Sequence, residues 1–340
     1  MSMITTAILG AGFSHAAGLP LTRDLFSTPE LPRSFSKESQ DRHREVRAAW
    51  RTWVLETGEN NAELWLRELY KARPVARFTL GTSWRNAMDF ALARLVQLPA
   101  GEKAPYYHGI TRSVTSEIHR RFWSQIRATF VLRYVVTMNY DILAEQGLRN
   151  TYSNRNRTPP ACYYGGFPFI QMVRKLMDVT TRRCELVPLG DEVGVFKMHG
   201  SLNWVVEPHA PDRLKIHDDV RAVFRTEPRL GRPLIVPPLP EEEHPPWLPE
   251  VWRTAREALA QSQLWFVCGY SLPPYDEALS ALFAQAAAKT FSLRVLVADP
   301  NSTALAERWS HITPAGTEVR PLPGLPELLA PANWPGAQGT

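Results

Sequence analysis

The sequence has little cysteine, and the cysteines that it has are scattered. Three occur in 340 residues, at Cys162, Cys184 and Cys268, and no two of them have the CxxC spacing. This pattern excludes a disulfide framework and a cysteine-rich zinc site of the usual spacing. The chain also lacks an HExxH segment and a His/Asp metal cluster, so we expect no bound metal.

Long hydrophobic runs and strong charge asymmetry are missing too. No stretch approaches the roughly 18 apolar residues that a membrane helix needs, and the segment MSMITTAILGAG is too short and too little charged for a secretory signal. We therefore expect a cytoplasmic protein without membrane contacts. The net charge of +5 is spread along the chain, so we do not expect direct nucleic-acid binding.

What the sequence does contain is an alternation of short apolar runs and helical patterns. We expect strands at 3–9, 130–137, 194–198, 264–268 and 293–298, and helices at 250–262, 276–288 and 303–309. Strands and helices that alternate across short turns indicate a parallel sheet covered on both faces. The sequence thus predicts an α/β fold with a Rossmann-like parallel sheet and helices on both faces.

A long helical region interrupts this alternation after the first strand and its helix. Apolar residues recur at spacings of three and four in 39–56, 62–72, 84–97 and 113–128. We expect a Rossmann-like domain of 1–36 and 129–325, a helical insertion of 37–128 and a surface tail of 326–340. We also expect a loop at 149–164, an insertion or covering segment at 207–249 and a surface stretch at 322–340.

Polar turns follow five of the predicted strands. These turns are Gly10–Ser14, Asn139–Asp141, His199–Ser201, Gly269–Ser271 and Asp299–Asn301. Ligands of open parallel sheets bind outside the carboxyl ends of the strands, so we expect the five turns to line one crevice.

The first of these turns is rich in glycine. Gly10 and Gly12 would let the backbone approach a diphosphate closely, and a helix that starts near Ser14 would direct N–H groups at the anion. However, His15 stands where a GxGxxG dinucleotide fingerprint needs its third glycine. A tight strand-to-helix turn without a ligand is an equally open interpretation.

Four ordered motifs together resemble the sirtuin family. Residues 10–20 (GAGFSHAAGLP) resemble the family's GAGxSxxAGxP, and 137–141 (TMNYD) resembles TQNxD in the TxNYD form of compact bacterial sirtuin-like proteins. Residues 197–201 (KMHGS) are similar to the segment with the catalytic histidine, and 269–273 (GYSLP) to the later GxS turn. The match of 297–299 to the adenosine-ribose contact is weaker. The resemblance implies that NAD is bound by Gly10, Ala11, Gly12, Ser14, Pro20, Arg23, Gly269, Ser271 and Asp299.

Two departures from the family pattern argue against protein deacylation. Sirtuins that remove acyl groups from lysine carry a four-cysteine zinc module shortly after the histidine segment, and no cysteine lies between His199 and 232–236 (RPLIV). The family's Pro-Asp-Phe-Arg is Pro20-Leu21-Thr22-Arg23 here, which keeps Arg23 but loses the acidic and aromatic residues. The resemblance therefore implies the zinc-less branch that hydrolyses NAD as an antiphage effector.

Cleavage of the nicotinamide–ribose bond needs an oxocarbenium-like ribose to be stabilised and water to be delivered. Asn139 suits the orientation of a ribose hydroxyl or of the attacking water, and His199 suits the role of base. Asp141 is a third catalytic candidate, which would hold a ribose hydroxyl or favour the positive transition state. An N-cap for a helix at 142–148 is an equal alternative for Asp141.

Three of the binding residues also have structural alternatives. Ser14 could contact phosphate or cap its own helix. Ser271 could likewise contact phosphate or cap the helix that follows it, although Asp276 is the better cap of that helix. Asp299 could accept a hydrogen bond from the adenosine ribose or form an Asp-Pro-Asn turn.

The alternatives to an NAD hydrolase are an NAD- or ADP-ribose-binding sensor without turnover, an NAD-dependent protein deacylase and a nucleic-acid-processing subunit. A pure binder has no need of both Asn139 and His199, and no clustered acidic metal site supports a nuclease. Because hydrolysis that kills the host must be held off until infection, we expect control by a homo-oligomer or by a partner such as a HerA-type ring ATPase or a short Argonaute. The helical region 37–128 is the candidate surface, and a linear or a cyclic ADP-ribose product stays open.

Overall fold

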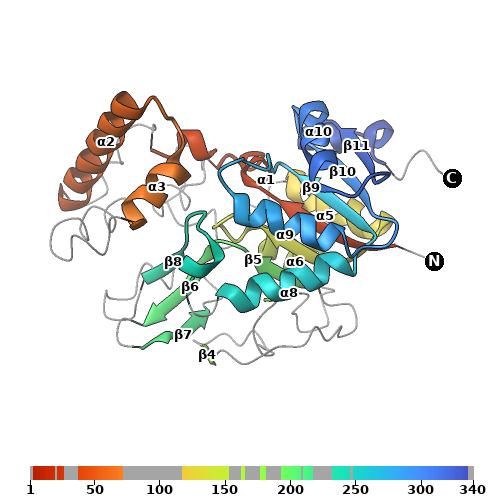
Figure 1. Ribbon diagram of the computed structural model, residues 1–340, viewed down its shortest axis with the longest axis horizontal. Coiled ribbons are helices and arrows are strands. Elements are labelled where there is room, and N and C mark those ends of the chain that lie inside the picture. Colours follow the sequence, from red (N-terminus) through yellow and green to blue (C-terminus); the bar gives the residue numbers. More distant parts are fainter. Residues whose placement is uncertain are drawn as a thin grey trace.

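The computed structural model describes residues 3–19, 21–26, 37–71, 117–152, 162–164, 177–180, 193–207, 210–216, 232–245 and 248–335. At its centre lies a seven-stranded sheet in which every neighbouring pair of strands is parallel (Figure 1). In pairing order, the strands are β11 (Glu318–Leu322), β10 (Arg294–Ala298), β9 (Leu264–Cys268), β1 (Ile4–Leu9), β2 (Val131–Thr137), β5 (Val193–Lys197) and β3 (Cys162–Tyr164). The predicted Rossmann-like parallel sheet is confirmed.

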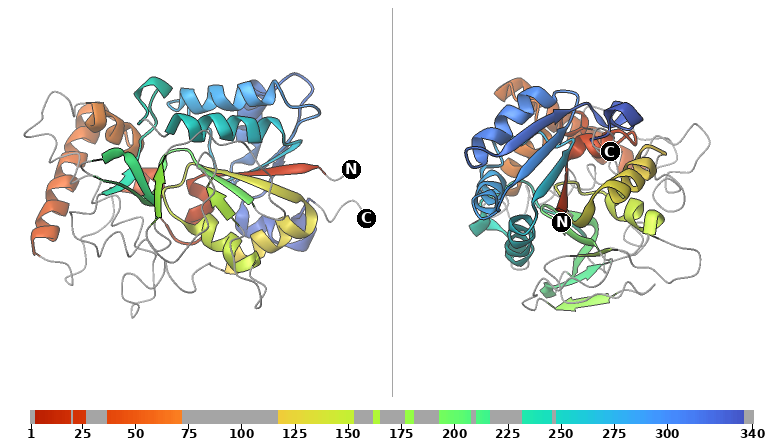
Figure 2. Two further views of the ribbon diagram at one scale, coloured as in Figure 1. Left: turned by 90° about the horizontal axis from the view of Figure 1, so that it is seen from below. Right: turned by 90° about the vertical axis from the view of Figure 1, so that its right-hand side faces the viewer.

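Helices cover both faces of this sheet (Figure 2). One face carries α5 (Glu117–Thr129) and α6 (Leu143–Tyr152), and the other carries α8 (Leu248–Ala260), α9 (Glu277–Ala287) and α10 (Ser302–Ile312). Apolar residues at helical spacing bury one side of each helix; α5, for example, packs Phe122, Trp123 and Ile126 into the core. The central strands β1, β5 and β9 are covered from both sides, which explains their nearly continuous apolar runs.

The order of the strands reverses next to β1. From β1 the sheet grows in one direction through β2 and β5, and later in the chain it grows in the other direction through β9, β10 and β11. In open α/β sheets a crevice forms at such a reversal, outside the carboxyl ends of the strands. Here hydrogen bonds join the carboxyl ends of β1 and β9, from Gly10 N to Cys268 O (3.1 Å) and from Gly12 N to Gly269 O (2.9 Å).

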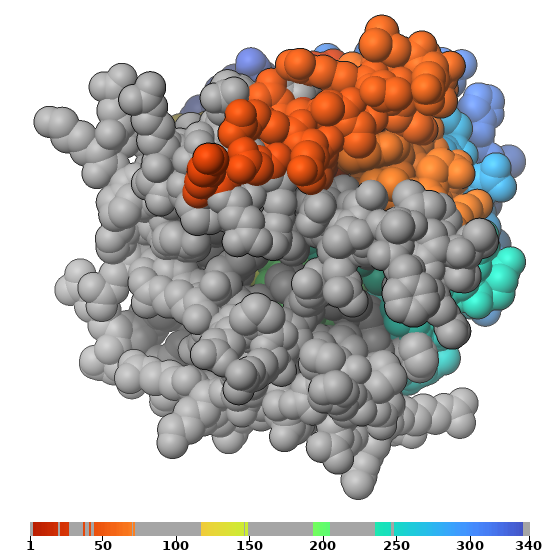
Figure 3. All heavy atoms as spheres, turned by 90° about the vertical axis from the view of Figure 1, so that its left-hand side faces the viewer, coloured from red at the N-terminus to blue at the C-terminus, as the bar shows by residue number. Residues whose placement is uncertain are grey.

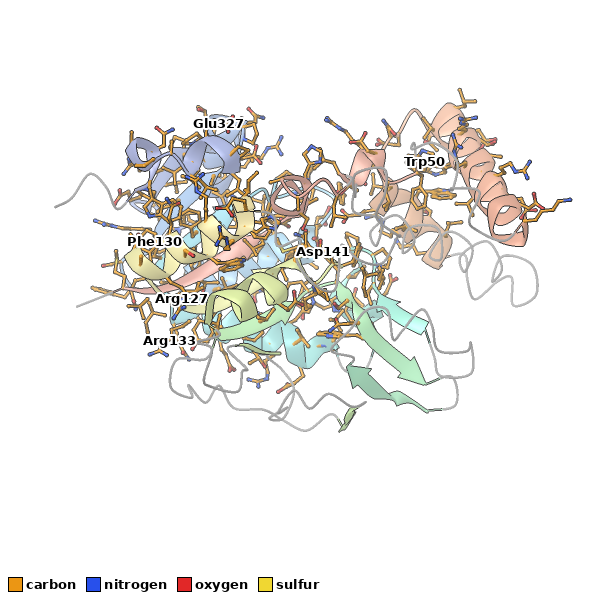
Figure 4. The ribbon with its side chains drawn as sticks, turned by 180° about the vertical axis from the view of Figure 1, so that it is seen from behind. Trp50, Arg127, Phe130, Arg133, Asp141 and Glu327 are labelled. Atoms are coloured by element: carbon orange, nitrogen blue, oxygen red, sulfur yellow. The ribbon has the colours of Figure 1, made fainter. Side chains whose placement is uncertain are left out.

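Two helices beyond the carboxyl end of the sheet build a second, smaller core. α2 (Lys37–Thr57) and α3 (Ala62–Lys71) confirm the helices predicted at 39–56 and 62–72, whereas 84–97 lies outside the described residues. Trp50 lies between α2 and α3 (Figure 4), with its ring centroid 5.5 Å from Phe26 and 5.4 Å from Trp65. In contrast, α5 packs into the main core, although it was predicted within the helical region.

A second sheet, which we did not predict, lies beside the first (Figure 1). It is antiparallel, and its strands in pairing order are β4 (Met177–Thr180), β7 (Ala210–Ile216), β6 (Gly200–Glu207) and β8 (Arg232–Ile235). The prediction of an insertion or covering segment at 207–249 missed β7 and β8, because a sequence such as APDRLKI in β7 has little apolar periodicity. The loop predicted at 149–164 was wrong at its ends, where α6 continues and β3 begins.

The C-terminal segment is packed against the body of the protein. α11 (Leu325–Leu328) and a 3-10 turn, η5 (Pro331–Asn333), follow the last strand, β11. The surface stretch expected at 322–340 was wrong here, because Leu328 and Trp334 are buried. The Trp334 indole stacks on Phe266 at 5.7 Å between ring centroids and donates from Nε1 to Thr129 Oγ1 (2.8 Å). Frequent proline and glycine in the segment concealed these apolar anchors.

Candidate active site

A cavity of about 510 Å³ opens at the carboxyl ends of the parallel strands. Turns that follow β10, β9, β1, β2 and β5 contribute to its lining, as their positions in the sequence predict, and α3 contributes as well. Of the predicted site residues, the lining includes Ala11, Gly12, Arg23, Asn139, His199, Gly269, Ser271 and Asp299. The others are Gly10, Ser14 and Asp141, which are not part of the lining of this cavity, and Pro20, which lies outside the described residues.

The glycines hold two neighbouring turns together. A Cβ atom on Gly10 would lie 2.5 Å from the carbonyl oxygen of Gly269, and one on Gly12 would lie 2.8 Å from the Gly269 Cα. Gly269 itself has a φ of +63°, and its Cβ would lie 2.3 Å from the backbone nitrogen of Phe13. No side chain fits at such distances from backbone atoms, so the packing of the turns alone requires glycine at all three positions.

Ser14, Asn139 and Asp141 form a hydrogen-bonded chain next to the cavity. The Asn139 amide donates from Nδ2 to the Gly10 carbonyl (2.8 Å) and to Ser14 Oγ (2.9 Å). Ser14 Oγ in turn donates to Asp141 Oδ2 (2.7 Å). Ser14 lies within the short helix α1 (Ala11–His15), whose N-cap is Gly10, so the alternative that Ser14 caps this helix was wrong. Asp141 Oδ1 accepts from the Leu143 N–H (2.9 Å) at the start of α6, as the N-cap alternative predicts.

A buried ion pair supports this chain. Lys197 of the histidine motif pairs with Glu145 of α6, with 3.1 Å between Nζ and Oε1, and its ammonium also donates to the Asp141 carbonyl. Figure 4 shows Asp141 in the interior, whereas Arg127 and Arg133 lie toward the opposite end of the sheet. Because loss of one buried partner leaves an unpaired charge, the pair fixes the end of β5 against the start of α6.

His199 pairs with an acid for which we predicted a different role. The His199 Nε2 lies 3.1 Å from Asp276 Oδ2, and both side chains are buried. Asp276 does precede α9, but its side chain makes no capping hydrogen bond, so the prediction that it caps this helix was wrong. A carboxylate at Nε2 holds the proton of a neutral imidazole there. Among the described residues, neither Nδ1 of His199 nor Oδ1 of Asp276 has a hydrogen-bond partner.

The charges around His199 favour its protonated form. Burial lowers the His199 pKa, but the charge and hydrogen bond of Asp276, together with the charge of Glu63, outweigh burial and raise this pKa above its ordinary value. The nearby His244 packs against Trp252, with 4.5 Å between ring centroids. Burial and the positive charge of His199 lower the His244 pKa to about 4. Perturbed groups gather in this way at functional sites more often than elsewhere.

Helix α3 and the residues just before it contribute to the cavity a set of side chains that we did not single out from the sequence. Asn60, Asn61 and Glu63 line the cavity, and Tyr275 faces it from the turn before α9. The Tyr275 hydroxyl donates to Glu63 Oε2 (2.8 Å), and Arg67 Nη1 donates to the Tyr275 carbonyl (3.4 Å). Burial raises the Glu63 pKa, against the lowering effects of His199 and of the Tyr275 hydrogen bond.

One local signal for this helix was available in the sequence. Asn61 Oδ1 accepts from the Glu63 N–H (2.9 Å) and from the Leu64 N–H (3.3 Å), so Asn61 caps the first turn of α3. A cap predicts where a helix starts, but it does not predict which part of the molecule the first turn faces.

The end of the cavity farthest from His199 along the sheet carries a cation. Arg308 of α10 lines the cavity and donates from Nη1 to the Ser271 carbonyl (3.2 Å). Asp299 lines it too, and its Oδ1 accepts from the Asn301 N–H (2.8 Å), as the Asp-Pro-Asn turn predicts. Asp299 follows β10 and His199 follows β5, four strands further along the sheet. At the usual strand spacing, these two positions are about 19 Å apart.

Metal clusters and membrane-spanning helices are both missing from the described part of the chain. Within it, no three His, Cys, Asp or Glu side chains are grouped so that they could hold a metal ion. Of the helices it contains, none is long and apolar enough to cross a membrane.

Solved structures that are similar to this chain share few of its residues. The chain is similar to a Sir2 homologue in complex with NAD (15% identity over 96% of this chain and 87% of the other, TM-score 0.47). It is also similar to a Sir2-homologue mutant in complex with 2′-O-acetyl-ADP-ribose (16% identity over 96% of this chain and 89% of the other, TM-score 0.49). A third similar structure is Sir2 with a p53 peptide and NAD+ (14% identity over 96% of this chain and 91% of the other, TM-score 0.43). No protein-family model and no curated protein matches the sequence. The chemistry of the site therefore has to be inferred from the residues of its own cavity.

Proposed function

We propose that this chain hydrolyses NAD at the bond between nicotinamide and ribose, which releases nicotinamide and ADP-ribose. The observation that carries this proposal is the arrangement of charged groups in the cavity, with Arg308 and Asp299 at one end and the His199–Asp276 pair with Glu63 at the other. NAD has matching groups, because an arginine can pair with its negative diphosphate, an aspartate can accept from its adenosine ribose, and carboxylates can face its positive nicotinamide ring. The four sirtuin-like motifs support the same ligand, since each contributes residues to the cavity lining.

The proposed orientation puts the diphosphate beside the first glycine turn and the Arg308 guanidinium. Asp299 then accepts a hydrogen bond from the adenosine ribose, through the oxygen that the Asn301 N–H does not occupy. The backbone of Ala11 and Gly12 follows the diphosphate, and Arg23, which is exposed and pairs with Asp24 at 3.6 Å, closes the rim. Gly269 and Ser271 line the cavity and are further proposed contacts of NAD. Contacts of NAD with Gly10, Ser14 and Pro20 are proposed from the sirtuin-like motif alone.

Asn139 is proposed to hold the nicotinamide ribose through its amide oxygen. Both of its observed side-chain hydrogen bonds come from Nδ2, to the Gly10 carbonyl and to Ser14 Oγ. This leaves Oδ1 to accept a hydrogen bond from a ribose hydroxyl or from the attacking water. Asp141 acts one step further away, because its contact with Ser14 fixes the Asn139 amide.

His199 is proposed to be the base. In the reaction, the bond between C1′ and the nicotinamide nitrogen breaks and its electron pair leaves with nicotinamide, while the oxygen of water bonds to C1′. The proton of this water goes to His199 Nδ1, because Nε2 is held by Asp276. The raised His199 pKa implies that turnover rises with pH as the imidazolium loses its proton.

Incubation of the purified chain with NAD, followed by chromatography for nicotinamide and ADP-ribose, tests this function. We expect Asn139→Ala and His199→Ala to lower turnover by about a hundredfold or more. His311→Ala, which removes an exposed histidine of α10, is the matched control and should leave turnover unchanged. Equal turnover in all variants would overturn the site. Binding of NAD without turnover would indicate a sensor, and nicotinamide release that depends on acyl-lysine would indicate a deacylase.

We further propose that the enzyme depletes NAD in the cytoplasm during abortive infection, as part of an antiphage system. The resemblance to zinc-less sirtuin-like proteins supports this role. Control would come from a homo-oligomer or from a partner such as a HerA-type ring ATPase or a short Argonaute, bound to the helical region 37–128. In Figure 3, α2 and α3 form part of the outer surface, where Leu55 is 85% exposed. A monomer by light scattering that hydrolyses NAD at full rate without any partner would contradict this form of control.

A further inference from the structure

Glu63 is an acid that the proposed reaction has not yet used. The Asn61 cap fixes the first turn of α3 and thereby directs Glu63 into the cavity, where the Tyr275 hydroxyl holds Oε2 at 2.8 Å. The carboxyl is therefore positioned from two elements that lie far apart in the sequence. An acid held in this way at a cavity wall is costly to ionise unless a cation is near.

The charged groups at this end of the cavity do not balance when Glu63 is ionised. Asp276 is matched by His199, at 3.1 Å between Oδ2 and Nε2. When Glu63 is ionised, two carboxylates therefore face one imidazolium, and one negative charge remains. The two arginines of the lining do not balance it, because Arg308 lies on α10 beside Ser271 and Arg23 pairs with Asp24.

We propose that Glu63 is a further substrate-binding and catalytic residue, whose carboxylate faces the positive charge of NAD+ at its nicotinamide ring and reacting ribose. This inference rests on the proposed NAD hydrolysis and adds a specificity to it. NAD+ has a positive nicotinamide ring, whereas the reduced ring of NADH is neutral, so the carboxylate selects the oxidised cofactor. As the bond to nicotinamide breaks, the charge passes to the ribose, where the same carboxylate stabilises it.

Nucleotide binding tests this specificity without any turnover. The full chain carrying Asn139→Ala, which stops consumption of the ligand, is titrated calorimetrically with NAD+ and with NADH. We expect NAD+ to bind about tenfold more tightly than NADH, a difference that one partly buried charge pair supplies. Adding Glu63→Gln should bring the ratio close to one by weakening NAD+ binding alone.

Two further substitutions separate the charge of Glu63 from its place in the fold. Glu68→Gln makes the same change at an exposed position of α3 and should leave the ratio unchanged. Glu63→Asp keeps the charge on a shorter side chain and should retain part of the NAD+ preference. Equal weakening of NAD+ and NADH in both Glu63 variants would indicate a structural role and overturn the inference.

The remaining outcomes distinguish this inference from the proposed function. If the unsubstituted chain hydrolyses NAD but Glu63→Gln leaves the NAD+/NADH ratio unchanged, the inference fails and the hydrolase stands. If Glu63→Gln changes the ratio of NAD+ to NADH affinity but the unsubstituted chain does not hydrolyse NAD, the role of Glu63 in binding is supported and the sensor is favoured over the hydrolase. If the unsubstituted chain neither consumes NAD+ nor binds NADH, the proposed function fails, and the inference fails with it.

Discussion

The cavity has two rims that are built in different ways. The strand-end rim, which carries Asn139, His199 and Gly269, is fixed by the register of a buried parallel sheet. The helical rim, which carries Asn61 and Glu63, belongs to α3 and depends on the small aromatic core around Trp50. A small core opens at a lower free energy than a large one. The strand-end rim therefore holds its side chains in fixed positions, whereas the helical rim holds Glu63 on an element that opens at a lower free energy.

The largest difference between the two rims is expected in the free energy of unfolding, when one glycine near each rim is replaced by alanine. Gly269→Ala forces a Cβ to within 2.3 Å of the Phe13 backbone, so we expect the free energy of unfolding to fall by about 4 kcal/mol or more. Gly58→Ala, between α2 and α3, has a similar φ of +71° but nothing within 4 Å of its Cβ. Only the backbone strain of about 1 kcal/mol remains there. Urea unfolding of both variants measures the difference, and similar losses would show that packing of the turns contributes little.

Asp276→Asn should have the next largest effect. This substitution should change the rate of turnover and not the free energy of unfolding. Asparagine is nearly isosteric but has no charge to favour the imidazolium, so the His199 pKa should fall. We expect turnover to fall by about a hundredfold and the rise of turnover with pH to move to lower pH. Rates measured from pH 5 to 9 test both. A rise at the same pH as in the unsubstituted chain would mean that His199 titrates independently of Asp276.

The strand-end rim was predictable because parallel strands bring their carboxyl ends to one edge. Once strands were recognised before Gly10, Asn139, His199 and Gly269, the topology of the fold required their turns to meet, whatever lay between them in the sequence. What this reasoning missed was the local packing. The glycines contact each other's turns, and Asp276 turns away from its helix to reach His199.

The helical rim was not predictable, for a physical reason. Glu63 lies in the segment NNAELWLREL, where an acid in the first turn of an amphipathic helix is typical of a solvent-facing position. Its role depends on Tyr275, which is 212 residues away in the sequence. Helical periodicity predicts which side of α3 is apolar but not which neighbour its polar first turn meets. The same limit applies to β3, a three-residue strand that pairs at the sheet edge out of chain order.

Trp50→Ala tests whether the helical rim can open alone. The ring is buried against Phe26 and Trp65, and its removal should cost about 3 kcal/mol within the small core. We expect faster hydrogen exchange in α2 and α3, unchanged protection in β1 and β9, and reduced turnover because Glu63 is no longer held in place. Tyr140 joins this small core beside Asn139, so the exchange of β2 marks how far the effect spreads. Uniformly faster exchange would mean that the two rims unfold as one unit.

The smallest effect is expected from Glu63→Gln, on stability. The Glu63 pKa is raised on folding, mainly by burial, so its stabilising contribution is complete below the unfolded-state pKa and is lost as pH rises through the folded-state pKa. Near pH 7.5 the ionised carboxylate is therefore a cost, and the uncharged glutamine should stabilise the chain by less than about 1 kcal/mol while turnover falls. Toward pH 4 the two proteins should converge, because the acid is then protonated. Urea midpoints at both pH values measure this. Greater stability only at high pH, together with lost turnover, would identify Glu63 as a residue kept for function, whereas lower stability at both would assign it to the packing of α3.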